Sequence, residues 1–246
     1  MTSPLVPAEL AFTGDGTPFS PTYGDIYHSR NGGLGQARHV FLGGNTLLGK
    51  NARWTSRSHF VILETGFGLG LNFLATWQAW RESGARGRLD FISVEMHPFR
   101  RDHLAGLLAP YPEMALLAAQ LVEQWPPLAP GAHTLIFDEG QVTLNLLFGD
   151  ALECLQHLDA NADAIYLDGF SPANNPGMWS PALIGIVSDR CRPQATLATW
   201  CAAGRLRRTL TDCGWSVERR RGFAVKRDML VAHRSQPSPD AGEASL

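Results

Sequence analysis

A run of four apolar residues that leads directly into a glycine-rich loop constrains this chain more than any other feature. Residues 60–63 read Phe-Val-Ile-Leu, a composition typical of a buried parallel strand. Glu64 ends this run, and Gly66, Gly68 and Gly70 follow at alternate positions. Beyond the loop, apolar residues recur at helical spacing. Glycine lacks a Cβ, so the loop can adopt positive φ and lets a ligand approach the backbone closely. The stretch predicts a strand, a glycine turn and a helix.

The spacing of the glycines helps to identify the class of ligand. A dinucleotide fingerprint reads G-x-G-x-x-G, whereas residues 66–70 read G-x-G-x-G and an acid stands two residues before them. A carboxylate there suits a ligand with a positive ammonium group better than it suits a pyrophosphate. S-adenosylmethionine (SAM) is such a ligand, because it carries an α-amino group and a sulfonium. A glycine turn that binds no ligand is the alternative, and the spacing disfavours a nicotinamide oxidoreductase.

Acids at later strand ends extend this pattern. Glu95 closes an expected strand over 89–95, where acids of nucleotide-binding α/β folds hydrogen-bond ribose hydroxyls. Asp150 opens an expected helix, as an N-cap or as a partner of the adenine amine, and the two roles are compatible. Asp168 follows an expected strand over 162–167, at the sheet edge where open α/β folds bind ligands. We expect Asp168 to take part in the chemistry, and a turn-forming Asp-Gly is the alternative.

Composition restricts the class of protein. The chain has 246 residues, of which 44% are hydrophobic and 18% are charged, as in an ordinary globular protein. No apolar stretch approaches the roughly 20 residues of a membrane span, and residues 1–20 contain no secretory signal. The four cysteines lack C-x-x-C spacing, which argues against zinc and for a reduced setting. We therefore predict a cytoplasmic protein with no membrane partner and no metal.

The formal net charge of -2 conceals a segregation of charge. Basic residues gather in the C-terminal part, namely Arg205, Arg207, Arg208, Arg219, Arg220, Arg221, Lys226 and Arg227. A solvated surface and a face that binds nucleic acid both explain such a cluster.

The order of these segments resembles that of a known family. The strand, glycine loop and later acids together resemble a class I SAM-dependent methyltransferase. Further segments resemble the methyltransferase domain of the tRNA 5-methylaminomethyl-2-thiouridine biosynthesis family (MnmC type), and the similarity extends over about residues 23–233. These segments are F-L-G-G-N at 41–45, G-F-G-L-G-L-N-F at 66–73, D-G-F-S-P at 168–172 and G-F-A-V-K-R at 222–227.

The resemblance implies an α/β, Rossmann-like fold with a mostly parallel seven-stranded sheet, an antiparallel last strand and a small N-terminal extension. We expect a flexible lead-in over 1–22, a β-rich extension over 23–58, the methyltransferase domain over 59–234 and a disordered tail over 235–246.

The resemblance also implies an activity, which is transfer of a methyl group from SAM to the exocyclic amine of 5-aminomethyl-2-thiouridine at a tRNA wobble position. Asp168 is then the catalytic residue, which orients the amine or takes its proton. The expected cofactor-binding residues are Glu64, Gly66, Gly68, Gly70, Asn72, Glu95, Asp150 and Asp168. The expected substrate-binding residues are Phe170, Pro172, Trp179, Arg205, Arg208, Lys226 and Arg227.

Two alternatives and one partner complete the expectations. A methyltransferase or aminopropyl-transferase that acts on a small amine uses the same fold, and an inactive RNA-binding module is the alternative without catalysis. The other half of the family's bifunctional members is an FAD-dependent oxidase that removes a carboxymethyl group. We expect either a stand-alone methyltransferase, with a separate oxidase acting upstream, or a fragment of a longer protein.

Overall fold

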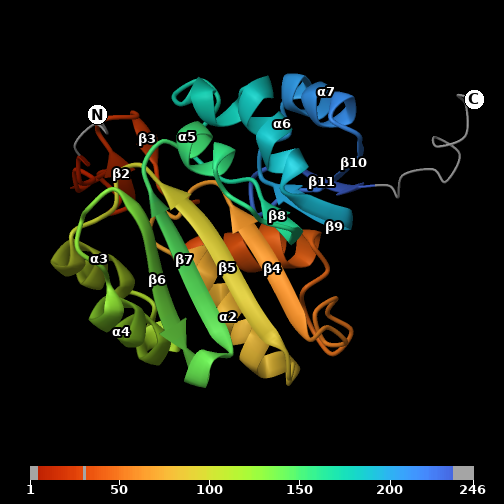
Figure 1. Ribbon diagram of the computed structural model, residues 1–246. Coiled ribbons are helices and arrows are strands. Elements are labelled where there is room, and N and C mark those ends of the chain that lie inside the picture. The colour runs from red at the N-terminus through yellow and green to blue at the C-terminus, as the bar shows by residue number, and fades with distance from the viewer. Residues whose placement is uncertain (1–4, 30–31, 235–246) are drawn as a thin grey trace, which may run out of the picture.

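One twisted sheet of eight strands forms the centre of the computed structural model, which describes residues 5–29 and 32–234 (Figure 1). The strand order is β10-β11-β9-β8-β4-β5-β7-β6. The strands are β4 (His59–Glu64), β5 (Arg88–Glu95), β6 (Gly131–Phe137), β7 (Val142–Phe148), β8 (Ala162–Tyr166), β9 (Cys191–Thr199), β10 (Trp215–Arg221) and β11 (Asp228–Arg234).

The sheet is mostly parallel. β4 pairs in parallel with β5 and β8, and these pair in parallel with β7 and β9. β11 is antiparallel to both of its neighbours, as expected near the C-terminus. The sheet has eight strands rather than the expected seven, because the β6–β7 hairpin adds an antiparallel edge strand. Since the chain leaves β4 first towards β5 and later returns to β8, the topological switch point lies between β4 and β8.

Helices cover both faces of the sheet (Figure 1). One face carries α1 (Gly33–Gln36), the π-helix η1 (Ala37–Gly43), α2 (Leu71–Ser83), α3 (Arg101–Leu108), the short 3-10 helix η2 (Pro112–Met114) and α4 (Ala115–Gln124). The other carries α5 (Ala151–Gln156), α6 (Pro181–Asp189) and α7 (Gly204–Asp212). The short helices η3 (Asp138–Gly140) and η4 (Pro176–Trp179) lie in connections. Because helices cover both faces, β4 is buried on both sides and its apolar run is continuous.

No single helix in the described ranges is long and apolar enough to cross a membrane. Only the pair formed by α3 and the segment Pro112–Gln124, bent by 118° at its break, reaches the length and composition of a span.

The N-terminal part differs from the sequence-based expectation. β1 (Ala11–Phe12), β2 (Pro18–Ser20) and β3 (Asp25–Ile26) form a separate three-stranded sheet, so strands lie mainly in the segment expected to be a flexible lead-in. The segment expected to be β-rich is helical over residues 33–43. Its abundant glycines obscured the helical spacing of Leu34, Ala37 and Phe41, which are all buried against the main domain. The tail expected over 235–246 lies outside the described residues.

The F-L-G-G-N segment at residues 41–45 packs and hydrogen-bonds against the sheet and so links this N-terminal part to it. The buried Asn45 donates from Nδ2 to the carbonyl oxygen of Ile165 at 3.3 Å, and its Oδ1 accepts a hydrogen bond from Thr196 Oγ1 at 2.6 Å. A Cβ on Gly44 would lie 2.6 Å from the Cβ of Ala198, so only glycine fits there. The segment therefore serves packing against β8 and β9.

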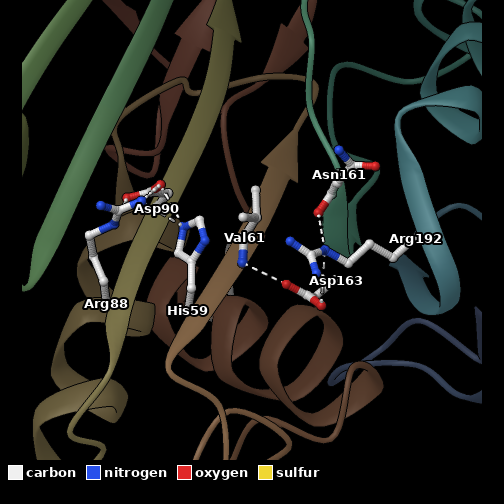
Figure 2. Close-up of polar contacts among 7 residues, drawn as sticks. All are labelled: His59, Val61, Arg88, Asp90, Asn161, Asp163 and Arg192. Atoms are coloured by element: carbon white, nitrogen blue, oxygen red, sulfur yellow. Dashed lines mark hydrogen bonds and ion pairs between the residues drawn. The ribbon is translucent and has the colours of Figure 1, made fainter.

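Polar contacts also tie strands together at the amino ends of β4, β5 and β8, away from the edge where the acids gather. Figure 2 shows Asp163, which accepts the Val61 N–H at 2.9 Å and lies 3.8 Å from Arg192. On the other side of β4, His59 Nε2 lies 2.7 Å from an oxygen of Asp90. These groups link neighbouring strands, so we assign them to the stability of the sheet.

Candidate functional site

A cavity of about 450 Å³ opens at the carboxyl ends of β4, β5 and β8, next to the topological switch point. Six segments of the main domain contribute lining residues: the glycine loop after β4, the end of β5, the start of α5, the loop from β8 into α6, the residue after β9 and the turn between β10 and β11. The N-terminal segment 23–29 closes the remaining side. The carboxyl ends of parallel strands share one edge, which explains why acids far apart in the sequence come together.

The glycine loop has the geometry that close approach of a ligand requires. Gly68 has a φ of 54° and donates its N–H to Glu95 Oε2 at 2.8 Å. A Cβ on Gly66 would lie 3.4 Å from the carbonyl oxygen of Asp168, so the loop runs close to the β8 connection. Gly66 and Gly68 line the cavity, whereas Gly70 does not. Gly70 instead has a φ of 76° at the N-cap of α2, where its missing side chain leaves room for Phe67.

Glu95 and Asp150 both line the cavity, as the sequence predicts. Glu95 fixes the position of the glycine loop, because its Oε2 accepts the Gly68 N–H while its Oε1 accepts the His97 N–H at 2.7 Å. Asp150 is the N-cap of α5, and its Oδ1 accepts the N–H of Leu152 at 2.9 Å. The N-cap role is confirmed, and contact with an adenine amine stays a prediction.

Glu64 lies behind the cavity wall and does not line it. Its Oε1 accepts a hydrogen bond from Asn72 Nδ2 at 2.8 Å, and its Oε2 accepts one from Ser93 Oγ at 2.6 Å. Burial, with further effects of the Asp168 and Glu95 charges, raises the pKa of Glu64 to about 8. Glu64 is therefore neutral at pH 7 and separated from the cavity by Asn72. The sequence predicts that Glu64 binds the cofactor amino group directly or through water. Its position behind Asn72 leaves only the indirect contact, which stays a prediction.

Asp168 presents its carboxylate to the cavity in a fixed orientation. Oδ1 accepts the Gly169 N–H at 2.8 Å and Trp200 Nε1–H at 3.0 Å, and Oδ2 accepts Asn72 Nδ2–H at 2.8 Å. A carboxylate can accept about four hydrogen bonds, so Oδ2 retains room for a donor that enters from the cavity. Burial raises the pKa of Asp168, while these three donors and the charge of Lys226 oppose the rise.

Asn72 connects the two acids. Its Nδ2 carries two hydrogens, and the distances to Glu64 Oε1 and Asp168 Oδ2 are both 2.8 Å. The sequence predicts Asn72 only as a cofactor contact. Trp200, which the sequence analysis missed, directly follows the last residue of β9. The same strand-end rule that found the acids, applied to this strand, would have found it.

Aromatic residues form one wall of the cavity. Phe170 lines it and stacks on Tyr23, with ring centroids 4.6 Å apart and planes inclined by 27°. Tyr27 meets Phe170 edge-on at 5.1 Å. Trp179, expected to contact substrate, is only 7% exposed and donates from Nε1 to the Phe170 carbonyl oxygen at 2.8 Å. Neither Trp179 nor Pro172 lines the cavity, so Trp179 supports the Phe170 loop from the core.

The two tyrosines were missed because they belong to the N-terminal segment, whose position depends on tertiary packing. Asp25, two residues after Tyr23, accepts the Ser171 N–H at 2.8 Å through Oδ2. This bond joins the N-terminal segment to the loop that carries Asp168 and Phe170.

The predicted basic residues divide into two groups. Arg205 and Arg208 are exposed on α7, and Arg227 is exposed in the turn between β10 and β11; none of the three lines the cavity. Lys226 does line it, and its Nζ lies 3.4 Å from the centroid of the Trp200 ring. The structure therefore separates Lys226 from the other basic residues.

A sequence model of a family described as S-adenosyl-L-methionine-dependent methyltransferase matches residues 112–235, which is half of the chain. The chain belongs to this methyltransferase family. The matched range contains Asp150 and Asp168, the family is SAM-dependent by its description, and the expected class I fold is confirmed.

Similar proteins carry more specific names. The chain is 53% identical over 245 residues to the tRNA 5-methylaminomethyl-2-thiouridine biosynthesis bifunctional protein MnmC of Azoarcus sp. (strain BH72). It is 54% identical over 246 residues to the protein of that name from Aromatoleum aromaticum (strain DSM 19018 / LMG 30748 / EbN1). Each match covers 98% of this chain but 38% of the relative, so the chain spans well under half the length of these curated relatives.

A solved structure gives the same picture of the fold. The crystal structure of MNMC2 from Aquifex aeolicus has a TM-score of 0.72 and 26% identity, and the match covers 96% of this chain and 72% of that chain.

The residues of the cavity fit SAM. Gly66 and Gly68 leave the backbone bare, and a side chain at either position would narrow the cavity. Glu95 and Asp150 supply acceptors for hydroxyl and amine groups along the wall. Within the described ranges, no group of three His, Cys, Asp or Glu side chains is arranged to hold a metal ion.

Proposed function

We propose that the chain methylates the exocyclic amine of 5-aminomethyl-2-thiouridine at the wobble position of a tRNA. The observation that carries this proposal is the Asp168 carboxylate, which three donors hold while Oδ2 keeps an acceptor position towards the cavity. An amine N–H is the kind of donor that fits this position. The names of the relatives support this substrate, because their product contains a methylated aminomethyl group.

Asp168 orients the nucleophile in this reaction. When bound, SAM supplies an electrophilic methyl group on its sulfonium. Asp168 Oδ2 accepts a hydrogen bond from the amine, which turns the nitrogen lone pair towards the glycine loop, and later accepts the proton that the methylated amine releases. Asn72 and Trp200 keep the carboxylate from rotating, so the acceptor position is preorganised.

The other cavity residues bind the cofactor and the base and exclude water. The backbone of Gly66 and Gly68, with Glu95 and Asp150, holds the nucleoside part of the cofactor. Phe170 offers a ring face to an unstacked base, as single-stranded anticodon bases are commonly recognised. Because Phe170 stacks on Tyr23 in this structure, the base either displaces that tyrosine or stacks beside it.

The basic surface contacts the tRNA backbone. Arg205, Arg208 and Arg227 are exposed around the sheet edge that carries the cavity and can each neutralise one phosphate. Affinity that depends on such contacts falls with salt and carries little sequence information. We further propose that the chain is cytoplasmic and that a separate FAD-dependent oxidase acts before this step.

The test is transfer of labelled methyl from SAM to bulk tRNA that lacks wobble-uridine N-methylation, followed by mass analysis of nucleosides. The proposal expects a new 5-methylaminomethyl-2-thiouridine signal that is abolished by Asp168→Asn, with SAM affinity kept within a few-fold. The Asp168→Asn change keeps the shape of the side chain but makes it a poor proton acceptor. Methylation of small amines without transfer to tRNA would overturn the proposed substrate, and near-normal turnover of the Asp168→Asn variant would overturn the role of the carboxylate.

A further inference from the structure

Lys226 is the only lysine or arginine among the described residues that line the cavity. It lies in the turn between β10 and β11, where its N–H donates to the Phe223 carbonyl oxygen at 3.0 Å. A Cβ on Gly222 would lie 2.4 Å from the Lys226 carbonyl oxygen, so this turn is tightly closed. The turn therefore fixes the point from which the Lys226 side chain enters the cavity.

The ammonium of Lys226 is directed at the Asp168 site. Its Nζ lies 3.4 Å from the centroid of the Trp200 ring, within the range of a cation–π contact. The same indole donates from Nε1 to Asp168 Oδ1 at 3.0 Å. Burial lowers the pKa of Lys226, and the negative charges of Asp168 and Asp25 oppose this effect. The Trp200 indole therefore binds the Asp168 carboxylate through its Nε1–H and the Lys226 ammonium through the face of its ring.

The other titratable groups around the cavity are mainly acidic. They are Asp25, Glu95, Asp150 and Asp168, together with His28 and the two tyrosines Tyr23 and Tyr27. Glu64 lies behind the wall and is neutral at pH 7, because its pKa is raised to about 8.

An acidic cavity creates a difficulty for amine methylation. Only the free lone pair of an amine can attack a methyl group, and an aliphatic amine is mostly protonated at neutral pH. A carboxylate beside such an amine favours its charged form and raises its pKa further. Without a positive charge to oppose these acids, the substrate would bind as an unreactive ammonium.

We propose that Lys226 keeps the substrate amine unprotonated by placing its positive charge beside Asp168 and Trp200. The inference rests on the proposed function. The positive charge of Lys226 offsets the negative charge of Asp168, so the protonated substrate amine gains little electrostatic stabilisation beside them. The amine therefore loses its proton to solvent on binding. The lone pair then forms the N–C bond as the C–S bond of the sulfonium breaks, and Asp168 accepts the proton of the methylated ammonium.

Arg227 provides a matched control, because it is the next residue in the same turn but points elsewhere. Its side chain is 94% exposed, and its Nε lies 4.0 Å from an oxygen of Asp228. Arg227 does not line the cavity. We expect it to contact phosphate, so its replacement weakens RNA binding without changing the ionisation of the substrate amine.

The first experiment follows kcat at saturating SAM and a saturating anticodon stem-loop containing 5-aminomethyl-2-thiouridine, from about pH 6.5 to about pH 9.5, because kcat reports ionisation in the bound complex. For Lys226→Met, we expect the ascending limb to move up by about one pH unit, so that activity is about tenfold lower near neutrality and recovers at high pH. Lys226→Arg keeps the charge and should keep the wild-type limb. Arg227→Met should raise KM at every pH while the ascending limb of kcat keeps its wild-type position.

The second experiment measures binding without SAM. The affinity for the aminomethyl stem-loop is divided by that for a stem-loop with plain 2-thiouridine, near neutral pH. We expect this ratio to rise several-fold in Lys226→Met, because the ammonium is no longer repelled, and to stay unchanged in Arg227→Met. An unchanged ratio together with a pH profile parallel to that of Arg227→Met would overturn the role of Lys226. Absence of methylation by the wild-type protein would instead overturn the proposed function.

Discussion

Replacement of the buried Glu64 by glutamine should change the pH dependence of stability in a defined direction. Glu64 is fully buried, and its carboxyl group accepts hydrogen bonds from Asn72 and Ser93. Burial raises its pKa from 4.5 to about 8. Glutamine is a neutral side chain of nearly the same shape, and it can accept from Asn72 while donating to the Ser93 hydroxyl. The Glu64→Gln variant therefore mimics the protonated form of Glu64 at every pH.

The sign of the effect follows from proton linkage. Between the unfolded and folded pKa values, the unfolded chain has lost the Glu64 proton while the folded protein retains it, so the stability of the wild type falls as pH rises. Each pH unit within this window is worth up to about 1.4 kcal/mol. From about pH 5.5 to about pH 7.5, the wild type should lose about 2.5 kcal/mol relative to Glu64→Gln.

Urea unfolding of both proteins at several pH values within this window measures the difference, and groups that titrate alike in both proteins cancel. Glu123→Gln on the exposed side of α4 is the control, and its difference from the wild type should stay flat. A flat difference for Glu64→Gln as well would mean that Glu64 is ionised in the folded protein, and the argument for a neutral buried acid would fail.

Two further changes test the bonds that hold the site and the sheet. Trp200→Phe removes the Nε1–H donor to Asp168 and keeps an aromatic ring. We expect kcat to fall roughly tenfold, as for the loss of one charge-assisted hydrogen bond, with SAM affinity retained. Steady-state kinetics measures kcat and calorimetry measures SAM affinity, and an unchanged kcat would contradict the prediction. Asp138→Asn weakens the bonds from Trp77 and Arg81, so we expect a loss of about 1 to 3 kcal/mol at pH 7 by urea unfolding. Because Arg81 lowers the pKa of Asp138, the ionised Asp138 stabilises the folded protein above the ordinary carboxyl pKa, and this stabilisation is lost in acid. If Asp138→Asn lowered the free energy of unfolding equally at all pH values, this explanation would be wrong.

Local sequence patterns were enough to predict the main strands of the sheet and the edge where ligands bind. The continuous apolar run at 60–63 and the mostly apolar segment at 89–94 form parallel strands, because such stretches must be buried on both faces. Acids that directly follow such runs reach the same edge in any parallel sheet, so Glu95, Asp150 and Asp168 were predictable from local pattern alone. The glycine loop was equally local, since its conformation depends on the missing Cβ.

Which of two similar residues faces the cavity depends on how distant segments pack together. Lys226 and Arg227 are adjacent cations, yet the turn directs only the first towards Trp200. Phe170 lines the cavity, whereas Trp179 is buried beneath it. The direction of a side chain, and hence its charge state and partners, depends on packing between segments far apart in the chain. Periodicity and strand ends carry no information about such contacts, so these assignments required the assembled fold.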